Sequence, residues 1–238
     1  MKKIFIALLA LLLVFGFTGC QKKEDPNKKS EGVMTYAEFA AAPLDSKVTI
    51  ETYVQGKQSW WDGKGTFYTQ DGEGGYFLYE MACSEAEYNK LTPGTKIRVT
   101  GTKAAWAGEV EIVDAKYEIL EGNYVATALD VTNLLGTDKL VEKINLFVSL
   151  KGLTVKDYGN GQAFEYKDTV GKTDDLYVKF EKNGVEFEFC VEFYLTGKDT
   201  DVYKAVEGLK IGDVVDIEGF LYWYNNPNVH MTKVTPAK

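Results

Sequence analysis

Short runs of alternating apolar and polar residues fill most of the chain after residue 34, and this period of two predicts β-strands with one buried face. The first such run is residues 48–54 (VTIETYV). Paired runs then flank short turns, which is the pattern of β-hairpins: residues 66–70 with 75–81, and residues 176–181 with 185–194. The second turn contains Asn183-Gly184, the strongest short hairpin signal. The chain is therefore predicted to be mainly β.

An internal repeat gives the order of these elements. Residues 91–101 (LTPGTKIRVTG) and 209–219 (LKIGDVVDIEG) share the form L-x-x-G-x-x-[IV]-x-[IV]-x-G. A short helical run precedes each copy, and a further strand follows it. Each half of the chain reads strand, hairpin, helix, strand, strand, which is the order of the OB-fold, a five-stranded Greek-key barrel. A β-sandwich is the alternative, but it needs about seven strands per copy and no helix at a fixed place.

Four glycines of the repeat support two tandem barrels. Gly94 and Gly212 stand where a helix turns into a strand, a position that often needs a positive φ. Gly101 and Gly219 stand where a strand of a small barrel must bend or bulge. The same glycines in the same register indicate two copies of one fold.

A short helical lead-in is predicted before each barrel. The first lead-in covers residues 35–42, from Thr35 to the residue before Pro43, and the second covers residues 130–135, from Asp130. Thr35 and Asp130 are both suitable N-caps, because their side-chain oxygens can accept from the first free backbone N–H groups. We expect these segments to cover the open end of each barrel.

The first twenty residues describe a secretory signal. Lys2 and Lys3 precede an apolar stretch at residues 4–17, and small residues follow it. Fourteen apolar residues are too few to span about 30 Å of hydrocarbon. Cys20 directly follows Thr18-Gly19, so the segment resembles a bacterial lipoprotein signal. That resemblance implies a lipidated Cys20 as the first mature residue, on the extracytoplasmic face of the cell membrane.

The domain limits follow from these signals. Residues 1–19 form the signal peptide, and residues 20–33 are charged, contain a proline and lack hydrophobic periodicity, which predicts a flexible tether. The barrels are expected at 34–122 and 123–238. The second has an insertion near 157–175, a segment rich in Gly, Asp and Thr.

Composition restricts the chemistry. The chain has 35 acidic and 27 basic residues and one histidine, His230. A single imidazole excludes most zinc sites and His-based catalytic groups, and no nucleophile elbow, phosphate loop, CxxC or HExxH is present. We therefore expect no enzyme activity, no cofactor and no metal, and we interpret His230 as structural. The DGEG sequence at 71–74 favours a hairpin turn over a calcium site. Cys83 and Cys190 are interpreted as buried free thiols rather than a disulfide.

All four tryptophans fall in loops at the rims of the predicted barrels. Ligands of OB-folds cross the face of strands 2 and 3, between the 1–2 and 4–5 loops. The candidate ligand-binding residues in those loops are Trp60, Trp61, Trp106, Tyr222, Trp223 and Tyr224. The rings either bind a ligand or pack as a lid or an interface. Trp106 and Trp223 recur at equivalent places in both copies, which favours packing for those two.

The chain resembles uncharacterised lipoproteins of Gram-positive gut anaerobes over most of its mature length, on residues 35–112 and 199–223. The resemblance implies a tandem OB-type fold and a lipid anchor, and no activity.

Three functions remain open. The first is a non-catalytic lipoprotein that binds an extracellular glycan or protein through its aromatic loops. The second is a protein that binds single-stranded nucleic acid through a basic strip of Lys64, Lys96, Arg98 and Lys103. An acidic chain repels phosphates at long range, which disfavours the second without excluding it. The third is a scaffold of an envelope complex.

Overall fold

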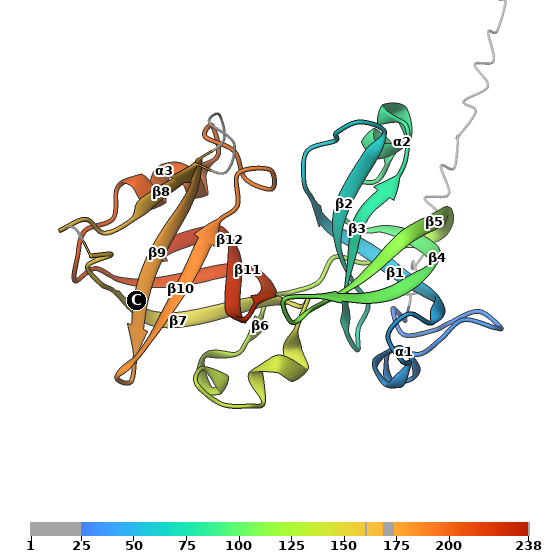
Figure 1. The fold of residues 1–238 in the computed structure, drawn as a ribbon, viewed down its shortest axis with the longest axis horizontal. Helices are drawn as coiled ribbons and strands as arrows, with labels where there is room; N and C mark the ends of the chain where they lie inside the picture. Colours follow the sequence, from blue (N-terminus) through green and yellow to red (C-terminus); the bar gives the residue numbers. More distant parts are fainter. Residues whose placement is uncertain (1–24, 160, 169–173, 238) are drawn as a thin grey trace, which may run out of the picture.

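The computed structural model of the chain describes residues 25–159, 161–168 and 174–237. Its strands form two closed five-stranded barrels that lie side by side (Figure 1). The predicted signal peptide and Cys20 fall outside the described residues. Within them, no helix combines the length and the apolar character that crossing a bilayer requires.

The first barrel has the strand order β1-β2-β3-β5-β4, and β4 pairs with β1 to close it. Its elements are β1 (Lys47–Lys57), β2 (Lys64–Gln70), β3 (Gly75–Ala82), α2 (Glu85–Lys90), β4 (Thr95–Trp106) and β5 (Glu109–Asn123). The helix α2 begins at its N-cap Ser84, whose hydroxyl accepts from Glu87 N while the Glu87 carboxylate accepts from Ser84 N. This reciprocal pair satisfies two of the free N–H groups at the helix start.

The second barrel repeats the order. Its elements are β7 (Phe147–Val155), β9 (Asp174–Lys182), β10 (Val185–Val191), α3 (Asp201–Glu207), β11 (Val214–Tyr224) and β12 (Asn226–Pro236). β7 pairs with both β11 and β9, which closes the barrel. Two short strands lie outside it: β6 (Leu129–Asp130) pairs with β7, and β8 (Glu165–Asp168), in the predicted insertion, pairs with β9. The tandem OB-fold prediction is confirmed, and a sandwich is excluded.

The repeated glycines have the predicted roles. Gly94 and Gly212 have φ of 93° and 91°, the left-handed region that a side chain rarely adopts. The β4–β5 register shifts between Thr100 and Thr102, on either side of Gly101, and the β11–β12 register shifts at Gly219. The bulges let each long strand curve around its barrel.

The two lead-ins differ from one another. α1 (Tyr36–Ala41) begins at Thr35 as predicted, with a capping box to Glu38, and places Phe39 in the first core. The second lead-in contains only the 3-10 turns η1 (Thr132–Leu134) and η2 (Leu140–Lys143). Asp130 is not the N-cap of η1; its carboxylate accepts from Thr132 N at 3.0 Å, which forms an Asx turn in place of a helix start.

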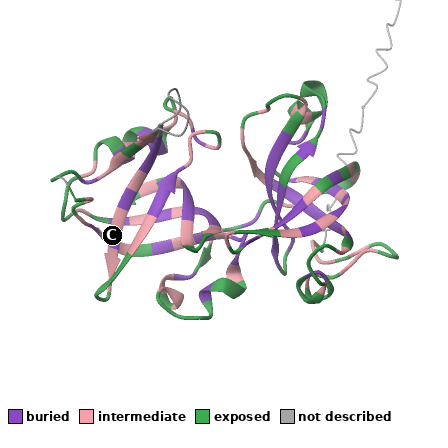
Figure 2. Cartoon of the chain, viewed as in Figure 1, coloured by how far each residue is buried: buried purple, intermediate pink, exposed green. Residues whose placement is uncertain are grey.

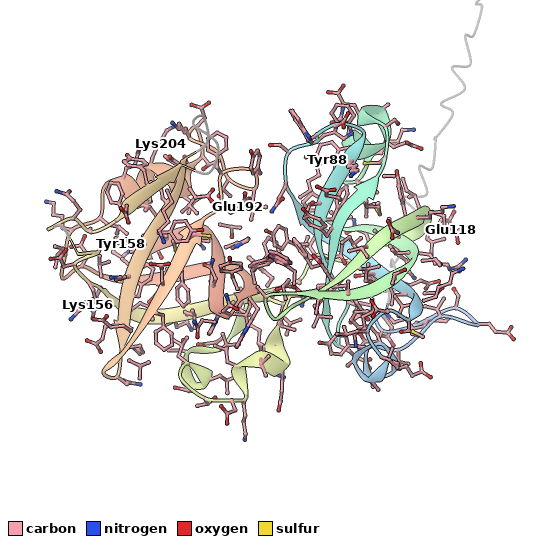
Figure 3. All side chains as sticks on the ribbon, viewed as in Figure 1. Tyr88, Glu118, Lys156, Tyr158, Glu192 and Lys204 are labelled. Carbon is pink, nitrogen blue, oxygen red and sulfur yellow. The ribbon has the colours of Figure 1, made fainter. Side chains whose placement is uncertain are left out.

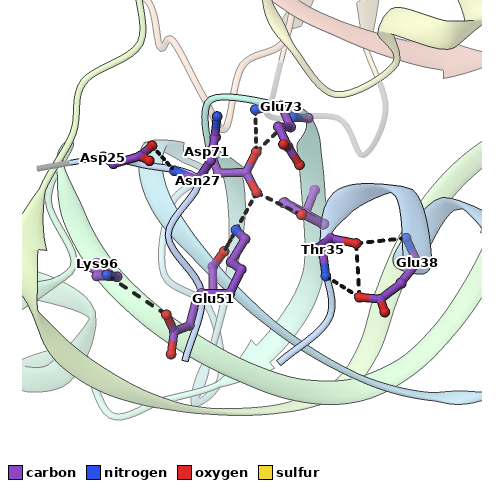
Figure 4. A network of polar contacts seen from close by, with 11 residues as sticks. Asp25, Asn27, Thr35, Glu38, Glu51, Asp71, Glu73 and Lys96 are labelled. Atoms are coloured by element: carbon purple, nitrogen blue, oxygen red, sulfur yellow. Dashed lines mark hydrogen bonds and ion pairs between the residues drawn. The ribbon is translucent and has the colours of Figure 1, made fainter. Parts of the chain in front are cut away.

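The segment 25–33 differs from the flexible tether that the sequence predicts. The Lys29 ammonium lies 2.5 Å from the Asp71 carboxylate of the first barrel, and both side chains are buried (Figure 4). Met34 N donates to Thr49 O at 2.9 Å. A buried ion pair is not visible in the periodicity of a polar segment, so composition alone mispredicted this part of the tether.

Each barrel has its own apolar core, visible as the buried stretches of its strands in Figure 2. A third cluster joins the barrels: Tyr68 of β2 and Phe77 of β3 pack against Phe220 of β11. The Tyr68 and Phe220 rings stack with centroids 4.5 Å apart. Gly56 lies beside the Phe220 ring, where a Cβ would approach within 2.7 Å.

We predict that Phe220→Ala lowers the free energy of unfolding by about 3 kcal/mol, since the substitution leaves a cavity where the barrels meet. Urea unfolding followed by fluorescence measures the change. Trp61→Ala is the matched control because Trp61 is 79% exposed. Equal stability of the Phe220→Ala variant and the wild type would contradict the proposed role of this contact.

Candidate ligand groove

The usual ligand face of the first barrel is covered by the second. Tyr68 and Phe77 point outward from β2 and β3, the strands that form this face in OB-folds. Both are nevertheless buried, at 1% and 3% exposure, because Phe220 packs on them. A ligand therefore has no access to the centre of this face.

A buried hydrogen-bond chain fixes the contact. Gln58 Nε2 donates to Tyr68 Oη at 3.1 Å, and Tyr68 Oη lies 2.6 Å from His230 Nδ1. Burial lowers the pKa of His230 to about 3, so the ring is neutral near pH 7. The Tyr68 proton needs an acceptor, which makes Nδ1 the acceptor and leaves the hydrogen on Nε2. His230 is thus buried and hydrogen-bonded across the contact between the barrels.

The same face of the second barrel is open. A groove of about 920 Å³ runs over it, within the size range of small-ligand sites. Tyr177 of β9 and Glu186 and Glu188 of β10 line one side. Phe77 and Tyr79 of the first barrel line the other. Both barrels therefore contribute walls to a single site.

The groove carries more negative than positive charge. Asp138, Glu186, Glu188 and Glu192 line it together with one cation, Lys167. Lys167 Nζ lies 3.2 Å from the Glu188 carboxylate and 4.0 Å from the centre of the Tyr177 ring. Within the described part of the chain, neither Glu186 nor Asp138 forms an ion pair. The groove therefore repels phosphates and favours neutral or cationic groups.

Polar groups of the second barrel also reach the groove. Glu192 lies on the side of this barrel that faces the first (Figure 3). Burial and the nearby Asp175 raise the pKa of Glu192 to about 7. Asn228 Oδ1 is buried without a hydrogen-bond partner among the described residues. A buried carbonyl without a hydrogen bond destabilises the folded state, because it has lost its contact with water. This oxygen can therefore accept a hydrogen bond from a ligand hydroxyl or amine.

The structure brings half of the predicted aromatic residues into the groove. Tyr222, Trp223 and Tyr224 line it, and Tyr224 is 54% exposed. Trp223 also packs against Gly108 of the first barrel, as expected for an interface residue. Tyr222 stacks on His230 with centroids 4.4 Å apart. The 4–5 loop of the second barrel thus serves both packing and the groove.

The other three aromatic residues lie outside the groove. Trp60 packs on the first core, and its Nε1 donates to Cys83 O at 3.0 Å. Trp61 projects from a tight turn and pairs across it with Lys64. Trp106 is 62% exposed, so the packing role that its repeated position suggested is wrong for this copy. Cys83 and Cys190 are buried free thiols, as predicted.

The residues that the sequence reading missed are Tyr177, Glu186 and Glu188. A signal for them was present: β10 reads Val-Glu-Phe-Glu-Phe-Cys-Val, so its glutamates alternate with core residues and must point outward. Combined with the OB-fold order, this alternation places them on the ligand face.

The predicted basic strip does not form. Lys103 is buried and donates to three backbone carbonyls at the end of α1. Arg98 pairs with Glu51 and Glu118, and the buried Lys96 lies 3.9 Å from Glu51. Lys64 pairs with Glu80 at 2.7 Å. All four cations are engaged by the protein, and they do not make a continuous positive surface.

A neutral carboxyl joins the 4–5 loops of the two barrels. Glu109 Oε2 accepts from Trp223 N at 2.8 Å, and Asn225 N donates to Ala107 O at 2.6 Å. Burial raises the pKa of Glu109 to about 8, and the nearby Glu111 contributes. Glu109 Oε1 has no partner among the described residues. The loops meet where the β4–β5 hairpin reaches β11 (Figure 1).

We predict that Glu109→Gln reduces the loss of stability between pH 5 and pH 8. The folded state keeps a proton on Glu109 that the unfolded chain releases, so folding becomes less favourable as pH rises from about 4.5 to about 8. Glutamine mimics the protonated form. Urea unfolding at each pH measures the slope. Glu121→Gln, on an exposed site of the same strand, is the control; an unchanged slope in Glu109→Gln would refute the assignment.

Among the described residues, no group of three His, Cys, Asp or Glu side chains is arranged to hold a metal ion.

No protein-family model and no curated protein matches the chain. Similar solved structures include a murine DNA-binding protein bound to double-stranded DNA, with 10% identity, 80% of this chain and 96% of that chain covered, and a TM-score of 0.34. The tetrameric p202 HIN2 structure has 12% identity, with 82% of this chain and 96% of that chain covered, and a TM-score of 0.34. A deletion mutant of the single-stranded DNA-binding protein from Thermus aquaticus has 15% identity, with 81% of this chain and 82% of that chain covered, and a TM-score of 0.31. These similarities concern the fold alone.

Proposed function

We propose that this protein is a non-catalytic binding protein, attached to the extracytoplasmic face of the cell membrane through a lipidated Cys20, that binds an extracellular ligand in the groove. One observation carries the binding function: the second barrel keeps its OB-fold ligand face open, and the first barrel adds a wall to it. The sequence motif before Cys20 supports the anchor.

A glycan is the ligand that suits the groove best. Tyr177, Tyr222 and Tyr224 offer ring surfaces to the apolar faces of sugars. Carboxylates and the unpaired Asn228 carbonyl accept hydrogen bonds from hydroxyl groups. A protein segment with basic side chains is the second ligand of this class, since it also suits the unpaired carboxylates of Glu186 and Asp138.

Single-stranded nucleic acid remains the alternative that the fold allows, and two of the similar structures are of DNA-binding proteins. The charges oppose it here. A phosphate chain in the groove would lie beside several carboxylates and one lysine, whereas binding to nucleic acid relies on paired phosphates and cations. A scaffold in an envelope complex would need no ligand in the groove.

We predict that Tyr224→Ala and Glu186→Gln each weaken glycan binding on the order of tenfold, about 1.4 kcal/mol, because each removes one contact to the ligand. A glycan array identifies the ligand, and calorimetry gives the affinities. Trp61→Ala is the control, since this ring is exposed and lies outside the groove.

Two outcomes would reject this function. An equal loss of binding in Trp61→Ala would place the site outside the groove. Retention on single-stranded DNA at about 50 mM salt that weakens steeply with added salt would favour the nucleic-acid alternative, because phosphate contacts release counterions.

The anchor is tested separately. We predict that a clickable fatty-acid analogue labels the wild type in cells and that Cys20→Ser removes both the label and the membrane association. Cys190→Ser is the control, because Cys190 is buried and is not an acceptor in a lipoprotein signal. Labelling that persists in Cys20→Ser would contradict the anchor.

A further inference from the structure

The segment 25–33, which we call the strap, is held on the first barrel by a buried ion pair. Lys29 and Asp71 side chains are 6% and 0% exposed. Lys29 Nζ also donates to Glu51 O at 2.7 Å. The ammonium therefore has two buried partners, and pulling it out would leave the Asp71 charge without its counterion. Breaking a buried pair on one side is strongly unfavourable.

Asp71 is prepared for this ion. Its Oδ1 accepts from Glu73 N at 2.7 Å and from Gly74 N at 2.8 Å, and its Oδ2 accepts from the Tyr76 hydroxyl at 2.9 Å (Figure 4). The β2–β3 turn thus holds the carboxylate in place, and Lys29 completes its coordination. Asn27 lies against Gly72 of the same turn.

The strap sets how far the barrel can move from an anchor at Cys20. Five Cα–Cα steps connect Cys20 to Asp25, and at about 3.6 Å per residue they reach no more than about 18 Å. With the strap released, fourteen steps to Met34 would reach about 50 Å.

The strap also sets the orientation of the barrel. Asn27 and Lys29, in the first half of the strap, contact the β2–β3 turn. Tyr79, a wall of the groove, lies four residues along β3 from Gly75, or about 13 Å. A short anchor beside the turn leaves this wall on the outer side.

We propose that the Lys29–Asp71 pair holds the first barrel against the bilayer surface, with the β2–β3 turn toward the membrane and the groove farther out. This inference rests on the anchor in the proposed function. The exposed residues around the turn are polar, including Asp25, Lys28 and Glu73. The partner is therefore the headgroup surface of the bilayer, and the barrel lies on it without insertion.

Hydrogen exchange tests the strap itself. In the chain from Cys20 onward, we expect Met34 N, bonded to Thr49 O, to exchange on the order of tenfold faster in Lys29→Met than in the wild type, since local opening becomes easier. Lys28→Met removes the same charge from an exposed neighbour and should leave exchange unchanged. Equal exchange rates of Met34 N in Lys29→Met and Lys28→Met would show that the Lys29–Asp71 ion pair does not hold the strap on the barrel.

Neutron reflectometry tests the position at the bilayer. Coupling the Cys20 thiol to a maleimide lipid in a supported bilayer makes the result independent of lipidation in cells, and Cys83 and Cys190 are buried. We expect a hydrated gap of no more than about 18 Å for the wild type and a wider one for Lys29→Met. Equal gaps, with the strap released in Lys29→Met, would overturn the orientation.

A double variant separates the loss of the ion pair from misfolding caused by a buried unpaired charge. Lys29→Met/Asp71→Asn removes both charges, so no unpaired carboxylate is buried. Its barrel should keep the wild-type thermal transition, and its gap should match that of Lys29→Met. A gap equal to the wild type in this folded variant would show that the ion pair does not hold the barrel at the membrane.

Discussion

The stacking of Tyr68 on Phe220 is the contact on which the rest of the structure depends. It sets the two barrels at one orientation, because the Tyr68 hydroxyl must also reach His230 of the second barrel. Aromatic stacking and a buried hydrogen-bond chain impose different geometric conditions, and few orientations satisfy both. The groove exists because this orientation brings Phe77 and Tyr79 opposite the open face of the second barrel.

Two copies of one topology therefore have unequal roles. The outer face of β2 and β3 is apolar and aromatic in the first barrel, which suits burial against a partner. The equivalent face of β9 and β10 carries Tyr177, Glu186 and Glu188, which suits contact with water or a ligand. A duplicated barrel that buried both faces would have no site. Burying one face gives a rigid wall beside the other.

The sequence predicts whatever depends on local period and turn chemistry. The repeat predicted both barrels, and Gly94 and Gly212 have the expected positive φ. What it could not predict are contacts between distant segments. Nothing in the alternation of β2 shows that Tyr68 faces another barrel, and nothing near Lys29 shows that Asp71 is its partner. Of the candidate residues chosen as loop aromatics, only those of the second barrel's 4–5 loop line the groove.

The distribution of charge explains why the groove is acidic. Cations that could have formed a binding surface satisfy buried groups of the fold instead. Lys103 donates to three carbonyls at the end of α1, and Lys29 neutralises Asp71. Of the described residues that line the groove, Lys167 is the one cation beside the carboxylates of β10, so negative charge predominates there. The acidic character of the groove thus follows from the residues of its own walls, while these cations of the first barrel serve its internal contacts.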